Sequence, residues 1–321
     1  MYVKIASVRH LHICTFSHLH INQAFAHSLS ICTLINTLTT DFIYLRTLLT
    51  PLYGEQEARA IAFIVLEDGF GVSRTDIYAD KVRQFSESER QTFLNMCDRL
   101  SAGEPLQYVI GHTAFCGHQF EVTPDVLIPR PETEELVAWA VETAQGLSSA
   151  ARPRLLDAGT GSGCIAISLQ LALPKAEVEA WDISRGALCV AERNAQRLHA
   201  PVCFKECDIL TVDASSVAPF DLIVSNPPYI CQREAADMDD NVLQHEPHTA
   251  LFVPNDDPLR FYRALAAHAL KRLNEGGALL VEVNRAYADA TAELFERMGL
   301  TRVELRRDDF GNQRMCRAIK G

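Results

Sequence analysis

The sequence lacks the features of three protein classes. It has no apolar run of about 18 residues, the length that a transmembrane helix needs. Its ten cysteines form no Cys-x-x-Cys pair, and the spacing of Cys203 and Cys207 does not fit a zinc ribbon. Basic residues are not in excess, because 30 Lys and Arg stand against 41 Asp and Glu, a net charge of −11. We therefore expect no membrane span, no metal site and no direct binding to nucleic acid, although a local basic patch stays open.

The composition is that of a globular protein, with 48% hydrophobic and 22% charged residues. At roughly 100–200 residues per domain, the 321 residues predict two domains. Scattered cysteines without a signal peptide are typical of buried, reduced thiols, so we expect a cytoplasmic protein. The chain has no internal repeat and no low-complexity segment.

The first 40 residues differ from the rest of the chain. Five of the eleven histidines precede residue 28: His10, His12, His18, His20 and His27. The two His-x-His pairs could chelate a metal, but no carboxylate or spaced cysteine pair completes a site. The segment also lacks the apolar stretch and cleavage site of a signal peptide. We expect residues 1–40 to be a poorly structured leader, or the product of a start codon assigned too far upstream.

Residues 41–105 predict a small helical domain. Ser86 or Ser88 offers an N-cap before Glu89. Apolar residues recur at helical spacing in three sets: Phe42, Leu45, Leu48 and Leu49; Ala60, Phe63, Ile64 and Leu66; and Phe93, Leu94, Met96, Cys97 and Leu100. Residues 106–130 predict a β-hairpin linker with turns at Gly111 and Gly117, built from the runs Tyr108–Ile110, Ala114–Phe115 and Gln119–Val122.

Residues 131–321 predict an open parallel sheet covered by helices on both faces. A first helix is expected over 132–145, opened by acidic residues that suit a helix N-terminus. Strands are expected at Arg154–Ala158, Glu177–Asp182, Val202–Cys207, Phe220–Ser225 and Ala278–Val283, and helices over about 163–172, 184–198, 258–273 and 285–298. The runs Arg302–Arg307 and Arg314–Ile319 flank a turn at 308–312, a closing hairpin that would add one antiparallel strand.

A glycine-rich loop follows the first expected strand of this sheet. In Asp157-Ala158-Gly159-Thr160-Gly161-Ser162-Gly163, glycine lets the backbone approach a ligand, and the following helix offers free N–H groups. Asp182 lies 23 positions after Gly159, at the end of the second strand, where a carboxylate can bind both hydroxyls of a ribose. The spacing of the third glycine differs from the dinucleotide fingerprint and favours S-adenosyl-L-methionine over NAD. Asp208, which ends the third strand, could accept from an adenine amino group or cap a turn.

A second motif, Asn226-Pro227-Pro228-Tyr229, follows the fourth strand at the edge of the sheet where such folds bind ligands. A planar amide or aromatic amine is hard to methylate, because its nitrogen lone pair is delocalised. The side-chain carbonyl of Asn226 and the backbone carbonyl of Pro227 can accept both N–H bonds of one NH₂ group. The prolines stiffen the loop, and Tyr229 can pack on the planar group. No strong base is required, because the methylated cation is very acidic.

With LIPRPETE at 127–134 and HEPHTALF at 245–252, these two motifs closely resemble the peptide chain release factor N5-glutamine methyltransferases, the PrmC or HemK family. The resemblance covers about residues 41–321. It implies a class I S-adenosylmethionine-dependent methyltransferase fold, a Rossmann-like seven-stranded sheet preceded by a helical domain that helps to recognise the substrate. It also implies transfer of a methyl group from S-adenosyl-L-methionine to N5 of the glutamine in the GGQ motif of class I release factors.

The resemblance assigns roles to particular residues of this chain. The cofactor site is expected at Asp157, Gly159, Thr160, Gly161, Ser162, Gly163, Asp182, Asp208, Ile209 and Asn226. Ile209 departs from the pattern, because the family often has an aromatic residue there. The catalytic and substrate-binding residues are expected to be Asn226, Pro227, Pro228 and Tyr229.

Several nearby residues stay open to two interpretations. Arg130 and Glu132 could line the cofactor pocket or form a salt bridge at the helix start. Glu246 and His248 could close the site, and His245 and His248 could act as bases, although the mechanism needs none. Trp139 and Trp181 fit the core or cofactor packing better than substrate contact.

Three alternatives share some of these features. A methyltransferase acting on a ribosomal-protein glutamine would use the same site. A DNA adenine N6-methyltransferase would need a recognition domain and a basic cleft, whereas residues after Tyr229 are expected to finish the sheet and residues 51–321 carry 27 basic and 40 acidic side chains. A cofactor-binding regulator without catalysis would have little use for Asn226.

Overall fold

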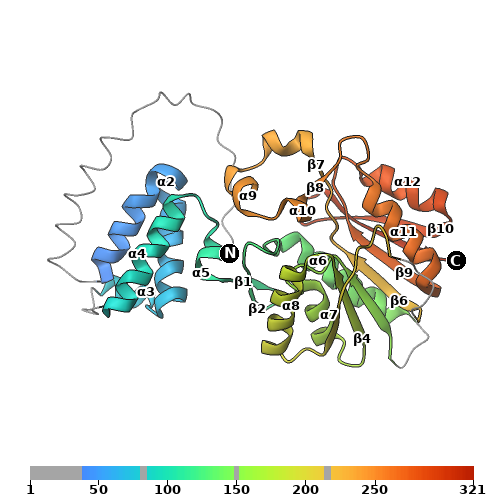
Figure 1. Cartoon of the computed structure of the whole chain (residues 1–321), viewed down its shortest axis with the longest axis horizontal. Helices are drawn as coiled ribbons and strands as arrows, with labels where there is room; N and C mark the ends of the chain where they lie inside the picture. The colour runs from blue at the N-terminus through green and yellow to red at the C-terminus, as the bar shows by residue number, and fades with distance from the viewer. Residues whose placement is uncertain (1–37, 80–84, 148–151, 213–217) are drawn as a thin grey trace. The chain divides into compact units, whose positions relative to one another are not determined.

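The computed structural model describes residues 38–79, 85–147, 152–212 and 218–321 (Figure 1). The expected leader, with its five histidines, therefore lies almost entirely outside the described residues. The chain divides into two compact units, Met1–Asp98 and Arg99–Gly321. No helix among the described residues is both long and apolar enough to cross a membrane.

The first unit is helical, as predicted. Its helices are α2 (Leu38–Phe70), α3 (Arg74–Tyr78) and α4 (Glu87–Ser101), the last of which runs past the unit boundary. Helix α2 is broken at Gly54, whose φ of 76° is not helical, three residues after Pro51. Ser86 is the N-cap of α4: the Glu89 amide donates to Ser86 Oγ, and the Ser86 amide donates to the Glu89 carboxylate.

The linker differs from the prediction at its start. Tyr108–Ile110 lie in helix α5 (Leu106–Ile110), not in a strand, and only β1 (His112–Phe115) and β2 (His118–Glu121) form the hairpin. Aromatic and β-branched residues favour a strand, but Pro105 starts a helical turn here and Gly111, at φ 83°, ends it. The helical turn buries Tyr108, whose hydroxyl donates to the Val126 carbonyl at 2.6 Å.

The second unit contains the predicted seven-stranded sheet, in the order β10-β11-β9-β6-β3-β4-β5. Strand β11 is antiparallel to both of its neighbours, and the pairs among β9, β6, β3, β4 and β5 are parallel, as expected. The strands are β3 (Arg154–Ala158), β4 (Glu177–Asp182), β5 (Val202–Glu206), β6 (Phe220–Ser225), β9 (Leu273–Glu282), β10 (Leu300–Arg307) and β11 (Gln313–Lys320).

Helices cover both faces of this sheet (Figure 1). Neighbouring strand residues point to opposite faces, so Leu155 packs with α6–α8 and Leu156 with α11 and α12. The three on one face are α6 (Pro131–Gly146), α7 (Cys164–Ala172) and α8 (Arg185–Arg197), and those on the other are α11 (Arg260–Arg272) and α12 (Ala288–Met298).

The expectation that residues after Tyr229 simply finish the sheet is wrong. Residues 230–253 form a series of short elements before the chain returns to the sheet through α11. They are β7 (Ile230–Cys231), the 3₁₀ helix η2 (Gln232–Asp237), α9 (Asp240–His245), α10 (His248–Leu251) and β8 (Phe252–Val253). Runs this short carry too little periodicity to be predicted from the sequence. They place Pro247 to Phe252 beside the carboxyl ends of the parallel strands, as the next subsection describes.

A buried amide ties the hairpin to the glycine-rich loop. Asn194 on α8 is fully buried, and its Oδ1 accepts the Glu121 amide at 2.7 Å. Its Nδ2 donates to the carbonyls of Glu121 and Ser162, both at 3.0 Å. One side chain thus satisfies three backbone groups, two of the hairpin and one of the glycine-rich loop, and burial makes each of them costly to leave unpaired.

We predict that Asn194→Ala lowers the free energy of unfolding by about 2–4 kcal/mol, because backbone groups of Glu121 and Ser162 lose their partner. Denaturant unfolding of the full chain measures this. The exposed Asn95→Ala on α4 is the control and should change the free energy by less than about 0.5 kcal/mol. Equal effects of the two variants would contradict the anchoring role.

The turn after β3 is organised by a second buried group, Asp157. Its Oδ2 accepts from the Thr160 hydroxyl at 2.6 Å and from the Ala166 amide at 3.1 Å. Burial raises the pKa of Asp157 to about 7, although these two hydrogen bonds favour the charged form. The folded state therefore holds this proton more tightly than the unfolded state, and Asp157 contributes stability at low pH that is lost as pH rises toward 7.

The amide of Asp157→Asn does not titrate, so we predict that the stability of this variant relative to the wild type rises between pH 5 and pH 7. The expected slope is up to about 1.4 kcal/mol per pH unit. Denaturant unfolding at several pH values measures it, with the exposed Glu293→Gln as the control. Parallel pH profiles for Asp157→Asn and the wild type would show that Asp157 keeps an ordinary pKa.

Candidate functional site

A cavity of about 360 Å³ lies at the carboxyl ends of β3, β4 and β6. It is lined by most of the residues that the sequence predicts to bind the cofactor: Gly159, Thr160, Gly161, Ser162, Asp182, Asp208, Ile209 and Asn226. Pro227 and Pro228 line it as well. Two further walls come from residues 125–133, just before and within the start of α6, and from residues 247–261.

Two predicted cofactor residues, Asp157 and Gly163, do not line this cavity. Asp157 is fully buried beneath the loop that it organises. Gly163 has a φ of 81°, and a Cβ there would lie 2.9 Å from Ile167 Cδ1 and 3.1 Å from Ala191 Cβ. Glycine at 163 therefore allows α7 and α8 to pack closely. Gly159 and Gly161 also have positive φ, but nothing lies within 4 Å of a Cβ at either position, so the backbone there faces open space.

Asp182 is held at the cavity wall by backbone donors. Its Oδ2 accepts the Gly161 amide and its Oδ1 accepts the Ser184 amide, both at 2.8 Å. Burial raises the pKa of Asp182, and these amides oppose the shift. Each oxygen keeps a lone pair that can accept from a ligand hydroxyl, so the carboxylate fits a vicinal diol.

Asp208 caps the turn that follows β5. Its Oδ1 accepts the Leu210 amide at 2.9 Å, and its Oδ2 accepts the Thr211 hydroxyl at 3.3 Å. Of the two roles left open by the sequence, the turn cap is present, and the residue also lines the cavity. The carbonyl of Ile209 bonds to the His268 ring at 3.0 Å, and Ile209 packs against the core on the α11 and α12 face.

Asn226 belongs to a hydrogen-bonded chain that the sequence did not predict. Its Nδ2 donates to Thr133 Oγ1 at 3.1 Å, and the Thr133 hydroxyl donates to Glu282 Oε2 at 2.7 Å. Tyr229, expected to pack on the substrate, donates its hydroxyl to Glu282 Oε1 at 2.9 Å. Burial raises the pKa of Tyr229 well above its usual value, with the Glu282 charge adding to the shift, so the hydroxyl keeps its proton.

A second cavity, of about 280 Å³, meets the first at Asn226 and Pro227. It is also lined by Tyr229 and by residues 237–239 and 250–251. Asn226 thus faces two adjoining spaces, one beside the glycine-rich loop and one beside Tyr229. This arrangement suits a residue that positions one molecule against another.

Arg130 does both things left open by the sequence: it lines the cavity and forms an ion pair, although its partner is Glu246 and not Glu132. Arg130 Nη2 lies 2.5 Å from Glu246 Oε1, and Glu246 Oε2 accepts the Ile128 amide at 3.2 Å. The Glu246 side chain is fully buried. This contact joins the 127–134 and 245–252 segments across one wall of the site.

Of the other open residues, only Trp181 lines either cavity within the described part of the chain. His245, His248 and Glu132 line neither of the two, and the His248 ring bonds to the Leu243 carbonyl at 2.8 Å. Trp139 is fully buried in the core, with the guanidinium groups of Arg306 and Arg317 4.3 and 5.1 Å from its ring. Trp181 is buried and donates to Glu179 at 2.6 Å, while also contributing to the cavity wall.

Thr133, Glu282 and Asn194 are the functional candidates that sequence reasoning missed. Thr133 lies in the LIPRPETE segment at 127–134, which supports the resemblance but gives Thr133 no role of its own. Glu282 is near the end of an expected buried strand. A carboxylate in an otherwise apolar strand is the one signal that could have singled out Glu282, because such a group needs buried partners.

Comparison with known proteins finds two family models that match this chain. Residues 47–111 match the family model "PrmC N-terminal domain", and residues 143–249 match "Methyltransferase small domain". The catalytic domain of hMettl16, solved with a MAT2A 3′UTR hairpin, has a TM-score of 0.50 at 16% identity, covering 80% of this chain and 90% of that chain, a likeness in fold.

Curated relatives extend the match to most of the chain. The release factor glutamine methyltransferase of Bacteroides thetaiotaomicron is 43% identical over 275 residues, which is 86% of this chain and 97% of the relative. That of Flavobacterium psychrophilum is 37% identical over 284 residues, 88% and 98% of the two chains. Identity at this level over nearly the whole of both relatives shows that this chain belongs to the release factor glutamine methyltransferase family.

Proposed function

We propose that this protein transfers a methyl group from S-adenosyl-L-methionine to the side-chain amide nitrogen, N5, of the glutamine in the GGQ motif of class I peptide chain release factors. The release factor is its protein partner, and it acts in the cytoplasm, where translation ends. The single observation that carries the proposal is Asn226, an amide held at the junction of two cavities in a chain of this family.

The first cavity fits S-adenosyl-L-methionine. Asp182 would accept the ribose hydroxyls, because it lines the cavity beside the glycine-rich loop and each of its oxygens, with one amide bound, has a lone pair to spare. The loop backbone at Gly159 and Gly161 lies open to a ligand, and the start of α7 offers N–H groups that suit a carboxylate. Asp208 and Ile209 would border the adenine. When bound, the cofactor supplies an electrophilic methyl group.

The second cavity would take the substrate glutamine. The Asn226 side-chain oxygen and the Pro227 carbonyl would each accept one N–H of the substrate NH₂ group. Both acceptors are held in place: Asn226 by its bond to Thr133 on α6, and Pro227 by its own ring and that of Pro228. Two acceptors on one nitrogen hold the lone pair in a set direction, and this effect grows as the nitrogen becomes pyramidal in the transition state.

The amide nitrogen gains a methyl group and loses one proton. The methylated nitrogen is very acidic before this loss, so water can take the proton and no side chain has to act as a strong base. This agrees with the placement of His245 and His248 outside both cavities. The site residues act by binding, orientation and charge complementarity.

Incubation of an unmethylated class I release factor with this protein and S-adenosyl-L-methionine tests the proposal, with the product read by peptide mass spectrometry. We expect one added methyl group on the GGQ glutamine. A release factor with asparagine in place of that glutamine should stay unmodified. Confirmed cofactor binding without methylation would overturn the proposal, and a ribosomal-protein glutamine would then be the next substrate to test.

We predict that Asn226→Ala lowers kcat by about 10²–10³-fold, because it removes an acceptor that acts mainly in the transition state. Affinity for S-adenosyl-L-methionine, measured by calorimetry, should stay within about threefold of the wild type, since a transition-state contact adds little to ground-state binding. Equal kcat values for the variant and the wild type would remove Asn226 from the mechanism.

We predict the opposite pattern for Asp182→Ala. The dissociation constant for S-adenosyl-L-methionine should rise by at least about tenfold, because hydrogen bonds to a charged group are worth about 1.5–3 kcal/mol. Calorimetry measures it, with the exposed Glu293→Ala on α12 as the control. An unchanged dissociation constant would refute the role of Asp182 at the ribose.

A further inference from the structure

Glu282 ends β9 as a buried carboxylate with an unusual set of partners. The residue is 2% exposed, and each of its oxygens accepts from one hydroxyl, Thr133 on Oε2 and Tyr229 on Oε1. Burial raises the pKa of Glu282, while these hydroxyls and the positive charge of Arg314 favour its charged form. A carboxylate that is supplied with two donors acts as an acceptor on both sides.

Because Glu282 accepts from Thr133, the direction of the next hydrogen bond, between Thr133 and Asn226, is fixed. Thr133 has a single hydroxyl proton, and it is used on Glu282. The Thr133 oxygen can then only accept from Asn226, so the NH₂ half of the Asn226 amide must face it, as the 3.1 Å contact shows. The carbonyl half of Asn226 is thereby kept away from Thr133.

This polarity matters because an amide has two ends of similar shape and opposite character. If the Asn226 amide turned over, it would present two donors where an acceptor is needed, and a substrate NH₂ group would meet them donor to donor. A threonine that only filled space would leave both orientations open. The hydroxyl of Thr133 is therefore the group that selects one of them.

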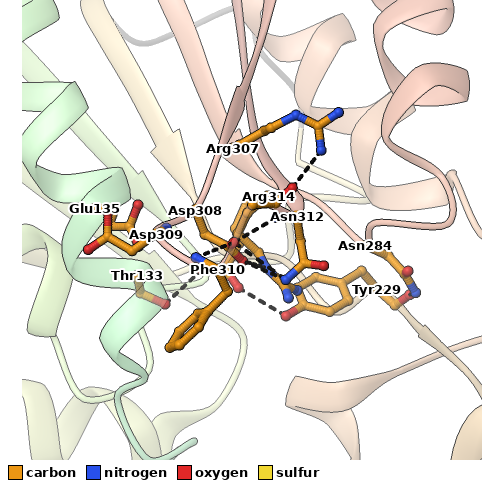
Figure 2. Close-up of polar contacts among 12 residues, drawn as sticks. Thr133, Glu135, Tyr229, Asn284, Arg307, Asp308, Asp309, Phe310, Asn312 and Arg314 are labelled. Carbon is orange, nitrogen blue, oxygen red and sulfur yellow. Dashed lines mark hydrogen bonds and ion pairs between the residues drawn. The ribbon is translucent and has the colours of Figure 1, made fainter. Parts of the chain in front are cut away.

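The charge of Glu282 is offset by Arg314, which follows the turn between β10 and β11. Arg314, at the start of β11, pairs with Asp308 at 3.3 Å. The Asp308 side chain is fully buried and accepts the amides of Phe310 and Asn312 at 3.0 and 2.8 Å. Figure 2 shows Thr133, Tyr229 and Arg314 gathered beside this turn. Asp308 thus holds the guanidinium of Arg314, whose positive charge acts on both Glu282 and Tyr229.

From this geometry we infer that Thr133 and Glu282 are positioning residues: Glu282 orients the Thr133 hydroxyl, which holds the Asn226 side-chain oxygen toward the nitrogen to be methylated. The inference rests on the proposed function, since it assumes that an amide nitrogen is the methyl acceptor. Neither residue needs to touch the substrate nitrogen. Their effect should appear in kcat and not in the affinity for S-adenosyl-L-methionine.

The test compares Thr133→Val, which keeps the shape and removes the hydroxyl, with Thr133→Ser, which keeps the hydroxyl. We expect Thr133→Val to lower kcat about tenfold or more, the effect of one lost orienting hydrogen bond, and Thr133→Ser to stay within about threefold. The dissociation constant for S-adenosyl-L-methionine should stay within about threefold for both. Thr143→Val, which removes another buried hydroxyl from α6, is the control and should keep the wild-type kcat. If Thr133→Val does not fold, Thr133→Ala takes its place under the same criteria.

A second arm separates orientation from general damage to the site. Asp at position 226 presents an acceptor whichever way it turns, so adding Thr133→Val to Asn226→Asp should lower kcat much less than adding it to the wild type. Equal losses of kcat in the two backgrounds would overturn the inference, as would equal kcat values for Thr133→Val and Thr133→Ser. If the wild type does not methylate the release factor in the same assay, that result contradicts the proposed function itself, whichever way the Thr133 variants behave.

Discussion

Buried carboxylates and their need for hydrogen-bond donors determine the conformations of the loops at the carboxyl edge of the sheet. A carboxylate taken out of water is costly unless donors surround it, and the ends of strands and helices carry N–H groups that lack partners. In several loops of the site a buried carboxylate accepts hydrogen bonds from such N–H groups. The carboxylates that do so are Asp157 in the glycine-rich turn, Asp182 after β4, Glu246 in the segment before α10 and Asp308 in the last turn, whereas Glu282 at the end of β9 accepts two side-chain hydroxyls.

The burial of these groups also affects their ionisation. Burial raises the pKa values of Asp157, Asp182 and Glu282, which means that their charged forms are held at some cost to stability. The donors that offset this cost are the backbone and hydroxyl groups whose positions matter to a ligand. The conformation of these loops and the ionisation of the carboxylates are therefore linked, because the same hydrogen bonds hold the loops and favour the charged carboxylates.

Much of this architecture could be predicted from the sequence, because its signals are local. The strands of the parallel sheet are apolar runs with turn residues at their ends, and the two motifs follow β3 and β6 directly. Prediction failed where local preference and context disagree, as at Tyr108–Ile110, where Pro105 and Gly111 impose a helical turn on residues that favour a strand. It also failed for residues 230–253, whose elements are too short to show a period.

The site network could not be predicted for a different reason. Thr133 is 93 positions from Asn226 and 149 from Glu282, so no spacing in the sequence connects them. They meet because β6 and β9 are neighbouring strands, with Ser225 paired to Val281, and α6 packs on one face of the sheet. The Asn226-Pro227-Pro228-Tyr229 motif supplies an amide, but the hydrogen-bond partner of its NH₂ group, Thr133, is brought to it by folding. Under the proposed mechanism the chemistry of this motif depends on the assembled sheet, because without Thr133 and Glu282 we would expect the same four residues to present either end of the amide to a substrate.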